Sequence, residues 1–244
     1  MNGFVNTFKQ WKSKIEPLER DDQRLLARIQ RLVPIEHTTT IIAGRSYPWT
    51  RVINPDQLLE QALSQSCKPA YEIDPFWAAT WRAATGLERF LDQVDIAGER
   101  ILELGCGSGR AGIGAALRGA QVVMTDVVGQ ALLVARFNAR LVKHQVSIRR
   151  LEWQSEQLPG PKFRYIIGSD IVYDPALHPI LEPCLRRHLT SDGVVFLSEP
   201  QRHTGDRFRA WIAAAGWRLQ EHLVDLEDNN RAIRIMALRL GVAR

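Results

Sequence analysis

The sequence predicts a doubly wound α/β fold, in which a seven-stranded, mostly parallel sheet has an antiparallel last strand and follows an N-terminal α+β arm. Two observations support this prediction. From Pro75 onward, short runs rich in aliphatic and β-branched residues alternate with helical patterns, the order expected for a parallel sheet covered on both faces. The last two runs are separated only by residues 225–230, DLEDNN, whereas a parallel crossover needs a dozen or more residues. The final strand is therefore expected to be antiparallel.

The elements of this domain follow from the same alternation of patterns. The predicted strands are residues 100–104, 121–125, 147–151, 165–169, 194–198, 218–224 and 232–238. The predicted helices are approximately residues 76–92, 109–118, 129–143, 176–189 and 204–215. This alternation of strands and helices predicts a mostly parallel sheet.

The first 70 residues have a different pattern. Residues 18–33 carry apolar side chains at helical spacing and are followed by Pro34, which predicts an amphipathic helix that ends there. Residues 38–53 alternate β-branched and aromatic residues around Gly44 and Pro48, which predicts two short strands joined by a turn. Asn54 and the proline after it predict the start of a short helix that reaches about residue 63. We expect an accessory arm over residues 1–70 and the main domain over residues 71–244.

Composition places the chain among ordinary globular proteins. It has 244 residues, of which 45% are hydrophobic and 24% are charged. No apolar run approaches the roughly 18 residues of a transmembrane helix, and the first residues lack the apolar segment of a secretory signal. We expect a cytoplasmic protein without a membrane partner.

The charged and sulfur-containing residues give weaker information. The net charge is +5 and the pI is near 9.4, but Lys and Arg are spread along the chain, which favours a solvated surface over a nucleic-acid site. Arg202, Arg207 and Arg209 are interpreted in this way. The three cysteines lack a C-x-x-C motif and a His pair at ligand spacing, so we expect free thiols and no metal site. The cysteines are Cys67, Cys106 and Cys184.

The stretch ILELGCGSGRAG, residues 101–112, fits two different glycine motifs. Read from Gly107 it is G-x-G-x-x-G, typical of a dinucleotide-binding turn. Read from Glu103 it is E-x-G-x-G-x-G, with Gly105, Gly107 and Gly109, which is typical of S-adenosylmethionine (SAM) enzymes. The predicted strand runs directly into Gly105, so the tight turn begins there and the second motif is favoured. In that motif Glu103 is placed to face the positively charged amino-acid part of SAM.

Three later positions provide candidate ligand contacts. Asp126 ends the second predicted strand, where its carboxylate can accept hydrogen bonds from both ribose hydroxyls, as NAD-binding proteins also require. Glu152 and Trp153 follow the third strand and offer an acceptor and a stacking face for adenine, although Trp153 could instead cap the sheet edge. Asp170 follows the fourth strand, at the edge where open α/β sheets bind ligands.

Together these motifs resemble the seven-strand, Rossmann-like SAM-dependent methyltransferases, and more specifically the protein-lysine methyltransferases with an Asp-x-x-Tyr/Phe motif after strand four. The stretch PFWA, residues 75–78, is most similar to the branch that methylates the β subunit of electron transfer flavoprotein, although that branch often has Trp-Pro-Gly/Ala where this chain has Trp-Arg-Ala at residues 81–83. The resemblance covers about residues 71–240. The matching residues are Glu103-Leu104-Gly105-Cys106-Gly107-Ser108-Gly109, Asp126, Glu152-Trp153 and Asp170-Ile171-Val172-Tyr173.

The resemblance implies SAM as the cofactor and a lysine side chain of a protein as the favoured acceptor. It implies that Asp170 orients the amine and attracts the cation, and that Tyr173 walls the acceptor channel. It assigns cofactor binding to Trp81, Glu103, Gly105, Cys106, Gly107, Gly109, Asp126, Val127, Glu152, Trp153 and Asp170. From the residues alone, Asp170 and Tyr173 could instead be a helix N-cap and a core aromatic, since Asp174 followed by proline offers a competing cap.

Other functions remain open at this level. A small-molecule N-methyltransferase, with a nicotinamide-like or other amine acceptor, shares the same fold and glycine loop, and fold alone does not decide the substrate. A non-catalytic SAM-binding or nucleic-acid-binding module fits the basic pI but leaves the Asp-x-x-Tyr motif unexplained. A nicotinamide-dependent oxidoreductase would require the other glycine motif.

Overall fold

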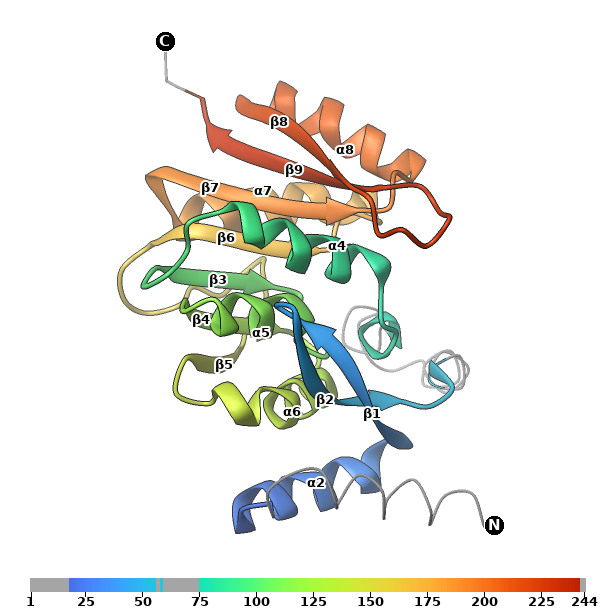
Figure 1. Cartoon of the computed structure of the whole chain (residues 1–244). Coiled ribbons are helices and arrows are strands. Elements are labelled where there is room, and N and C mark those ends of the chain that lie inside the picture. Colours follow the sequence, from blue (N-terminus) through green and yellow to red (C-terminus); the bar gives the residue numbers. More distant parts are fainter. Residues whose placement is uncertain (1–17, 56–57, 59–74, 242–244) are drawn as a thin grey trace.

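The central feature is a seven-stranded sheet with the order β5-β4-β3-β6-β7-β9-β8 (Figure 1). The computed structural model describes residues 18–55, 58 and 75–241. The strands are β3 (Arg100–Leu104), β4 (Gln121–Asp126), β5 (Val146–Arg150), β6 (Phe163–Ser169), β7 (Leu189–Glu199), β8 (Trp217–Val224) and β9 (Ile233–Leu240). Strands β3 to β7 pair in parallel, whereas β9 is antiparallel to both β7 and β8. The predicted fold class, including the antiparallel last strand, is confirmed.

Helices cover both faces of this sheet. On one face lie α4 (Arg82–Phe90), α5 (Arg110–Leu117) and α6 (Gly129–Asn138), and on the other lie α7 (His178–His188) and α8 (His203–Ala214) (Figure 1). Each face has its own buried apolar cluster. Strand β3 contributes to both, because alternate residues of a strand point to opposite faces.

The structure divides three of the predicted helices. Residues 76–92 form a 3-10 turn, Pro75–Ala78, then α4, then a second turn, Leu91–Gln93. The break occurs because Trp81 is extended, with φ −79° and ψ 139°, and its indole Nε1 donates to the Phe76 carbonyl at 2.7 Å. Helix α6 likewise ends at Asn138, before a 3-10 turn. A fourth 3-10 turn, Pro175–Leu177, precedes α7.

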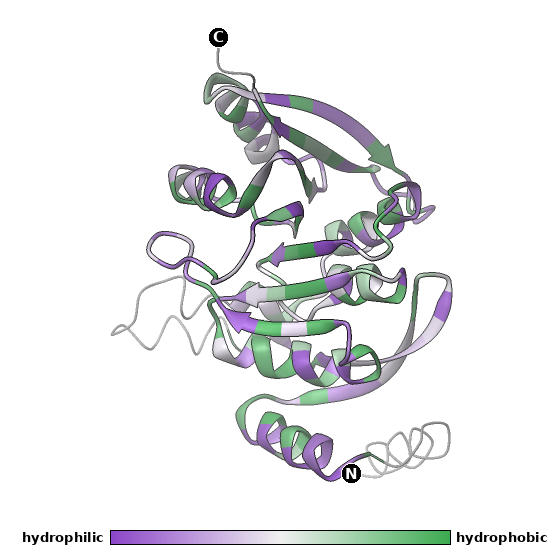
Figure 2. Cartoon of the chain, turned by 90° about the vertical axis from the view of Figure 1, so that its left-hand side faces the viewer, coloured by the Kyte–Doolittle hydropathy of each residue, from purple (hydrophilic) through white to green (hydrophobic). Residues whose placement is uncertain are grey.

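The N-terminal arm packs on the same face as α5 and α6. It contains α2 (Arg20–Leu32) and an antiparallel hairpin of β1 (Ile35–Ile42) and β2 (Arg45–Val52). Most residues of α2 are hydrophilic (Figure 2), and buried apolar residues of α2 cluster with those of α6. The hairpin adds buried Ile42, Tyr47 and Trp49 to the core under α4 and α5. The arm therefore extends the hydrophobic core of the main domain.

Some predictions fall partly outside the described residues. The helix expected from Asn54 to about residue 63 lies mostly there, and Asn54 itself has a left-handed φ of 52°. Cys67 also lies there, while Cys106 and Cys184 are free and buried. Within the described part of the chain, no helix is both long and apolar enough to cross a membrane.

The strand order places a ligand-binding edge at the centre of the sheet. From β3 the chain continues through α5 to β4 on one side, and from β6 it continues through α7 to β7 on the other. The loops after β3 and β6 therefore diverge, which opens a crevice at the carboxyl ends of these neighbouring strands. Strands β3, β4, β5 and β6 end at residues 104, 126, 150 and 169. The candidate site residues that follow these strands therefore lie at this edge.

Candidate active site

The loop Gly105–Gly109 joins β3 to α5 at this crevice. Gly105, Gly107 and Gly109 all have left-handed φ values, of 62°, 52° and 94°. A Cβ at Gly107 would lie 3.1 Å from the backbone oxygen of Trp77, and one at Gly105 would lie 2.8 Å from a methyl carbon of Ile171. Both the backbone conformation and the available space therefore require glycine. Gly112 lies inside α5, so the tight turn begins at Gly105, as the E-x-G-x-G-x-G motif predicts.

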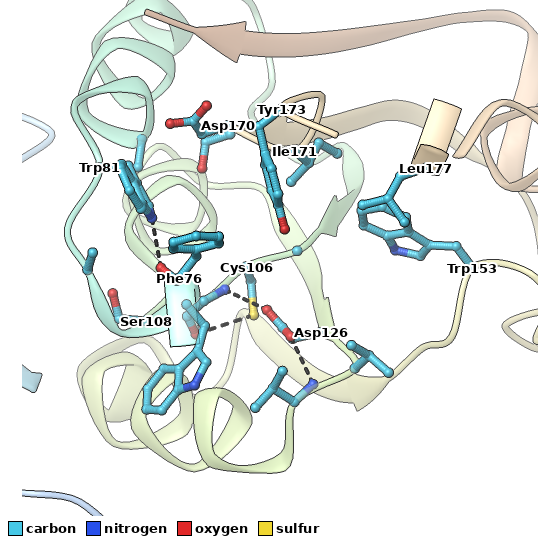
Figure 3. A pocket seen from close by; sticks show the side chains of 18 of the residues that line it. Phe76, Trp81, Cys106, Ser108, Asp126, Trp153, Asp170, Ile171, Tyr173 and Leu177 are labelled. Carbon is cyan, nitrogen blue, oxygen red and sulfur yellow. Dashed lines mark hydrogen bonds between the residues drawn. The ribbon is translucent and has the colours of Figure 1, made fainter. Parts of the chain in front are cut away.

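Asp126, at the end of β4, orients this loop. Its Oδ2 accepts a hydrogen bond from the Gly107 N–H at 2.9 Å, and its Oδ1 accepts one from the Val128 N–H at 2.9 Å. The carboxyl group is buried, and the residue lines the cavity described below. The two backbone donors fix the carboxylate at the junction of two loops (Figure 3).

The N-terminal hairpin supports the glycine loop from behind. Asn138, fully buried, donates from Nδ2 to the carbonyls of Thr50 and Ser108, both at 3.0 Å, and accepts from the Thr50 N–H at 2.9 Å. Arg110 donates to the Thr40 hydroxyl at 3.1 Å and to the Ile41 carbonyl at 2.6 Å. Sequence patterns did not indicate these contacts, because they join residues 30 to 88 positions apart.

A cavity of about 310 Å³ lies between the glycine loop, the start of α4 and the loop after β6. Most of the residues predicted to bind SAM or the acceptor line it. They are Trp81, Gly105, Cys106, Gly107, Asp126, Val127, Glu152, Trp153, Asp170 and Tyr173. Sequence positions as distant as 81 and 173 thus contribute to one site.

Glu103 and Gly109 do not line this cavity. Glu103 is 1% exposed and lies beneath the loop, where Oε2 accepts a hydrogen bond from the Gly112 N–H at 3.1 Å. Its neighbours Leu102 and Leu104 belong to the α7 and α8 face, so the side chain of Glu103 points to the α5 face. Burial raises the pKa of Glu103 to about 8, although the Gly112 hydrogen bond opposes the shift. The expectation that Glu103 faces the ligand is therefore corrected.

Gly109 is excluded from the cavity wall for a different reason. It is the N-cap of α5, and a Cβ there would lie 2.4 Å from the Met124 Cε in the core. Its role is thus to let the helix start against the sheet. Cys106 does line the cavity, but burial raises the pKa of its thiol well above the ordinary value, so the thiol stays protonated.

Glu152 and Trp153 form a second wall. The carboxylate of Glu152 caps its own turn, accepting from the N–H groups of Gln154 at 2.9 Å and Ser155 at 3.0 Å. Burial alone would raise its pKa, but these hydrogen bonds and that of the Ser155 hydroxyl lower it overall. Trp153 lines the cavity (Figure 3), and its carbonyl accepts a hydrogen bond from Arg187. This wall presents an aromatic face next to a fixed carboxylate.

Aromatic side chains surround the other end of the cavity. Phe76 stands edge-on to Trp81, with ring centroids 6.0 Å apart, and edge-on to Tyr173, at 5.7 Å (Figure 3). Phe76 is 43% exposed, so it lies at the rim. The three rings form an apolar wall around the entrance to Asp170.

Asp170 is a buried carboxylate at this end. It has a left-handed φ of 55°, and its N–H donates to the Ser198 carbonyl at 2.8 Å. Burial raises the pKa of Asp170, although a hydrogen bond from Arg202 opposes part of the shift. Asp174, not Asp170, is the N-cap, since its Oδ1 accepts from the Ala176 N–H at 2.9 Å. The alternative of a capping role for Asp170 is thereby removed.

Arg202 is a charged cavity residue whose role the sequence did not indicate. The expectation of a solvated surface fits the exposed Arg207 but not Arg202. Arg202 lines the cavity and donates to Asp170 Oδ1, with its guanidinium carbon 5.5 Å from the Trp81 ring centroid. Its position three residues after β7, whose carboxyl end lies at the same sheet edge, was the available signal.

Comparison with known proteins gives consistent matches. A family model described as lysine methyltransferase matches residues 73–211, which is more than half of the chain. The electron transfer flavoprotein beta subunit lysine methyltransferase of Xenopus laevis is 36% identical over 139 residues, which cover 53% of this chain and 54% of that protein. Protein N-lysine methyltransferase METTL21A of Danio rerio is 35% identical over 137 residues, which cover 53% of this chain and 63% of that protein.

Among solved structures, the glycopeptide N-methyltransferase MtfA complexed with SAM has a TM-score of 0.58 at 13% identity, covering 67% of this chain and 97% of that one. At this identity the likeness concerns the fold alone. The sequence match to the two lysine methyltransferases named above covers 54% and 63% of their length, which is about half to two thirds.

Proposed function

Because the chain belongs to the lysine methyltransferase family, we propose that it transfers a methyl group from SAM to the side-chain amine of a lysine in a protein. The observation that carries the proposal is the pairing of two sites in one cavity. A glycine loop with its anchoring carboxylate, Asp126, forms one wall, and the buried carboxylate Asp170 lies among aromatic rings at the other end.

The first of these sites fits a nucleoside cofactor. The loop at Gly105 and Gly107 presents backbone without side chains, which allows close approach of a ligand. Asp126 is placed to accept hydrogen bonds from ribose hydroxyls, with Val127 beside it, and Trp153 offers a stacking face for adenine. When bound, SAM supplies a methyl group activated by its sulfonium. Trp81 and Cys106 complete the wall.

The second site fits an amine acceptor. A lysine with its ordinary pKa of about 10.4 must lose a proton before its nitrogen can attack. Removal from water between Phe76, Trp81 and Tyr173 lowers the pKa of the amine, because burial disfavours the charged form. Asp170 attracts the cation and orients the amine through a hydrogen bond, and Tyr173 walls the channel. Positioning, rather than a strong base, then provides most of the rate enhancement.

The acceptor is inferred to be a protein side chain. The relatives named above are described as methylating proteins, and the rim residues Phe76 and Arg202 are reachable from solvent. We also propose that residues 1–70 form an accessory arm, that residues 71–244 form the catalytic domain and that the protein is cytoplasmic.

A transfer assay tests this function. The enzyme is incubated with radiolabelled SAM and a cell extract, and SAM binding is measured by calorimetry. Asp170→Asn keeps a residue type that tolerates the left-handed backbone, so it removes the charge without changing the fold. We expect a labelled protein band for the wild type and its loss in Asp170→Asn, with SAM still bound. Asp174→Asn, in the neighbouring cap, is the matched control and should retain the band.

Other outcomes would select other functions. Label found only in small molecules would indicate a small-molecule N-methyltransferase. SAM binding without any transfer would indicate a non-catalytic SAM-binding module, and protection of the fold by NADH but not by SAM would indicate an oxidoreductase.

A further inference from the structure

A positive charge already occupies the site between Trp81 and Asp170. The guanidinium of Arg202 donates from Nη1 to Asp170 Oδ1 and lies 5.5 Å from the Trp81 ring centroid. A carboxylate combined with an aromatic face is a recurring combination for recognition of alkylammonium groups. The chain's own arginine thus makes the two contacts that an acceptor ammonium group would make.

The two partners of this ion pair differ in mobility. The Asp170 side chain is 5% exposed, and its backbone N–H is bonded to the Ser198 carbonyl, so the carboxylate has little freedom to move. The Arg202 side chain is 40% exposed. Its backbone N–H is separately held by Glu199 Oε2 at 2.7 Å. The guanidinium can therefore swing into solvent while the loop after β7 keeps its conformation.

We propose that Arg202 is a specificity-determining residue that competes with the acceptor for Asp170 and must be displaced when a cationic amine binds. The inference rests on the proposed function, because it takes the Asp170 end of the cavity as the acceptor site. Two cations cannot share the buried carboxylate without mutual repulsion, so an incoming ammonium group replaces the guanidinium. A neutral acceptor gains no charge interaction with Asp170 and does not displace Arg202. The competition thus lowers the affinity for cationic acceptors and leaves the affinity for neutral acceptors unchanged.

The experiment measures binding of n-butylammonium, which has the chemistry of a lysine side chain, to full-length protein saturated with S-adenosylhomocysteine. Dissociation constants are obtained by ligand-observed NMR, with n-butanol as the neutral probe. Because a partly exposed ion pair is worth up to about 1 kcal/mol, we expect Arg202→Gln to bind n-butylammonium about two- to fivefold more tightly than the wild type. Binding of n-butanol should not change.

Three further variants make the test specific. Arg209→Gln removes an arginine of α8 that pairs with Asp206 and Glu221, and it should leave the affinity for n-butylammonium unchanged. Arg202→Lys keeps a competing cation and should restore an affinity near that of the wild type. Asp170→Asn should lose n-butylammonium binding. Binding of S-adenosylhomocysteine to each variant verifies its fold.

The outcomes separate this inference from the proposed function. Failure of S-adenosylhomocysteine to bind the wild type would contradict the proposed function itself. If it binds, unchanged or weaker n-butylammonium binding in Arg202→Gln would overturn the competition. Absence of n-butylammonium binding from both the wild type and Arg202→Gln would do the same, because the site would then not recognise an ammonium group.

Discussion

Asn138→Ala is expected to destabilise the protein strongly, because Asn138 links the hairpin to the glycine loop. Its side chain is fully buried and makes three hydrogen bonds, of which two go to Thr50 and one goes to Ser108. Alanine would leave the Thr50 N–H and two carbonyl oxygens without these partners. A buried polar group left unpaired costs about 1–3 kcal/mol, and carbonyls tolerate this better than N–H groups.

The expected loss in the free energy of unfolding is therefore about 3 kcal/mol, mostly from the Thr50 N–H and partly from the two carbonyls. For a domain of this size, about 1 kcal/mol corresponds to roughly 2–4 °C, so the melting temperature should fall by about 6–12 °C. Because Ser108 belongs to the cofactor loop, affinity for SAM should also fall in the folded variant.

Urea denaturation of wild type and variant measures this loss, and calorimetry measures SAM binding. Tyr47→Phe is the matched control, because the Tyr47 hydroxyl donates to the Asn138 carbonyl at 2.7 Å without contacting the loop. It should cost about 1 kcal/mol and leave SAM affinity nearly unchanged. A loss below about 1 kcal/mol for Asn138→Ala, or equal effects of the two variants on SAM binding, would refute the reasoning.

Three further variants test the loop, the buried carboxyl group and the cofactor wall. Gly109→Ala should lose about 1–2 kcal/mol from its φ of 94° plus a further amount from contact with Met124, and urea denaturation should show a larger loss than for Gly98→Ala, where a Cβ meets nothing within 4 Å. Glu103, with its pKa raised to about 8 by burial, stays neutral in the folded state while the unfolded state ionises near its ordinary value of 4.5. The free energy of unfolding of the wild type should thus fall as the pH rises from about 4.5 to 8. Glu103→Gln should not show this fall. If the free energies of unfolding of wild type and variant change in parallel with pH across that range, the assignment is contradicted. Trp153→Ala should weaken SAM binding about 5- to 100-fold by calorimetry while retaining transfer at saturating SAM, and an unchanged affinity would exclude stacking there.

The strands and the glycine loop were predictable because their signals are local. Buried parallel strands are near-continuous apolar runs, which is the signal in β3, β4, β6 and β7. Six of the seven strands begin and end within two residues of the predicted bounds, whereas β7 begins five residues earlier than predicted. The loop after β3 was predictable because its left-handed backbone requires glycine at Gly105 and Gly107. The cap at Asp174 is local in the same way, because it depends only on an Asp followed directly by a proline.

Features that depend on contacts between distant residues were not predictable. The sequence indicated that β9 is antiparallel, but not that it lies between β7 and β8. Trp81 interrupts a helical pattern because its indole bonds to the Phe76 carbonyl. Arg202 was assigned to a solvated surface although it binds Asp170, 32 residues earlier.

By itself, the sequence determined the α/β class, the register of the glycine loop and the residue types at the sheet edge, since each follows from backbone conformation and the spacing of apolar residues. Only the tertiary structure decided where the side chains point. It turned Glu103 beneath the loop, joined Asn138 to the hairpin and brought Arg202 onto Asp170. The physical reason is that side-chain direction and ion pairing depend on which elements meet in space, and this is set by the packing of the whole chain.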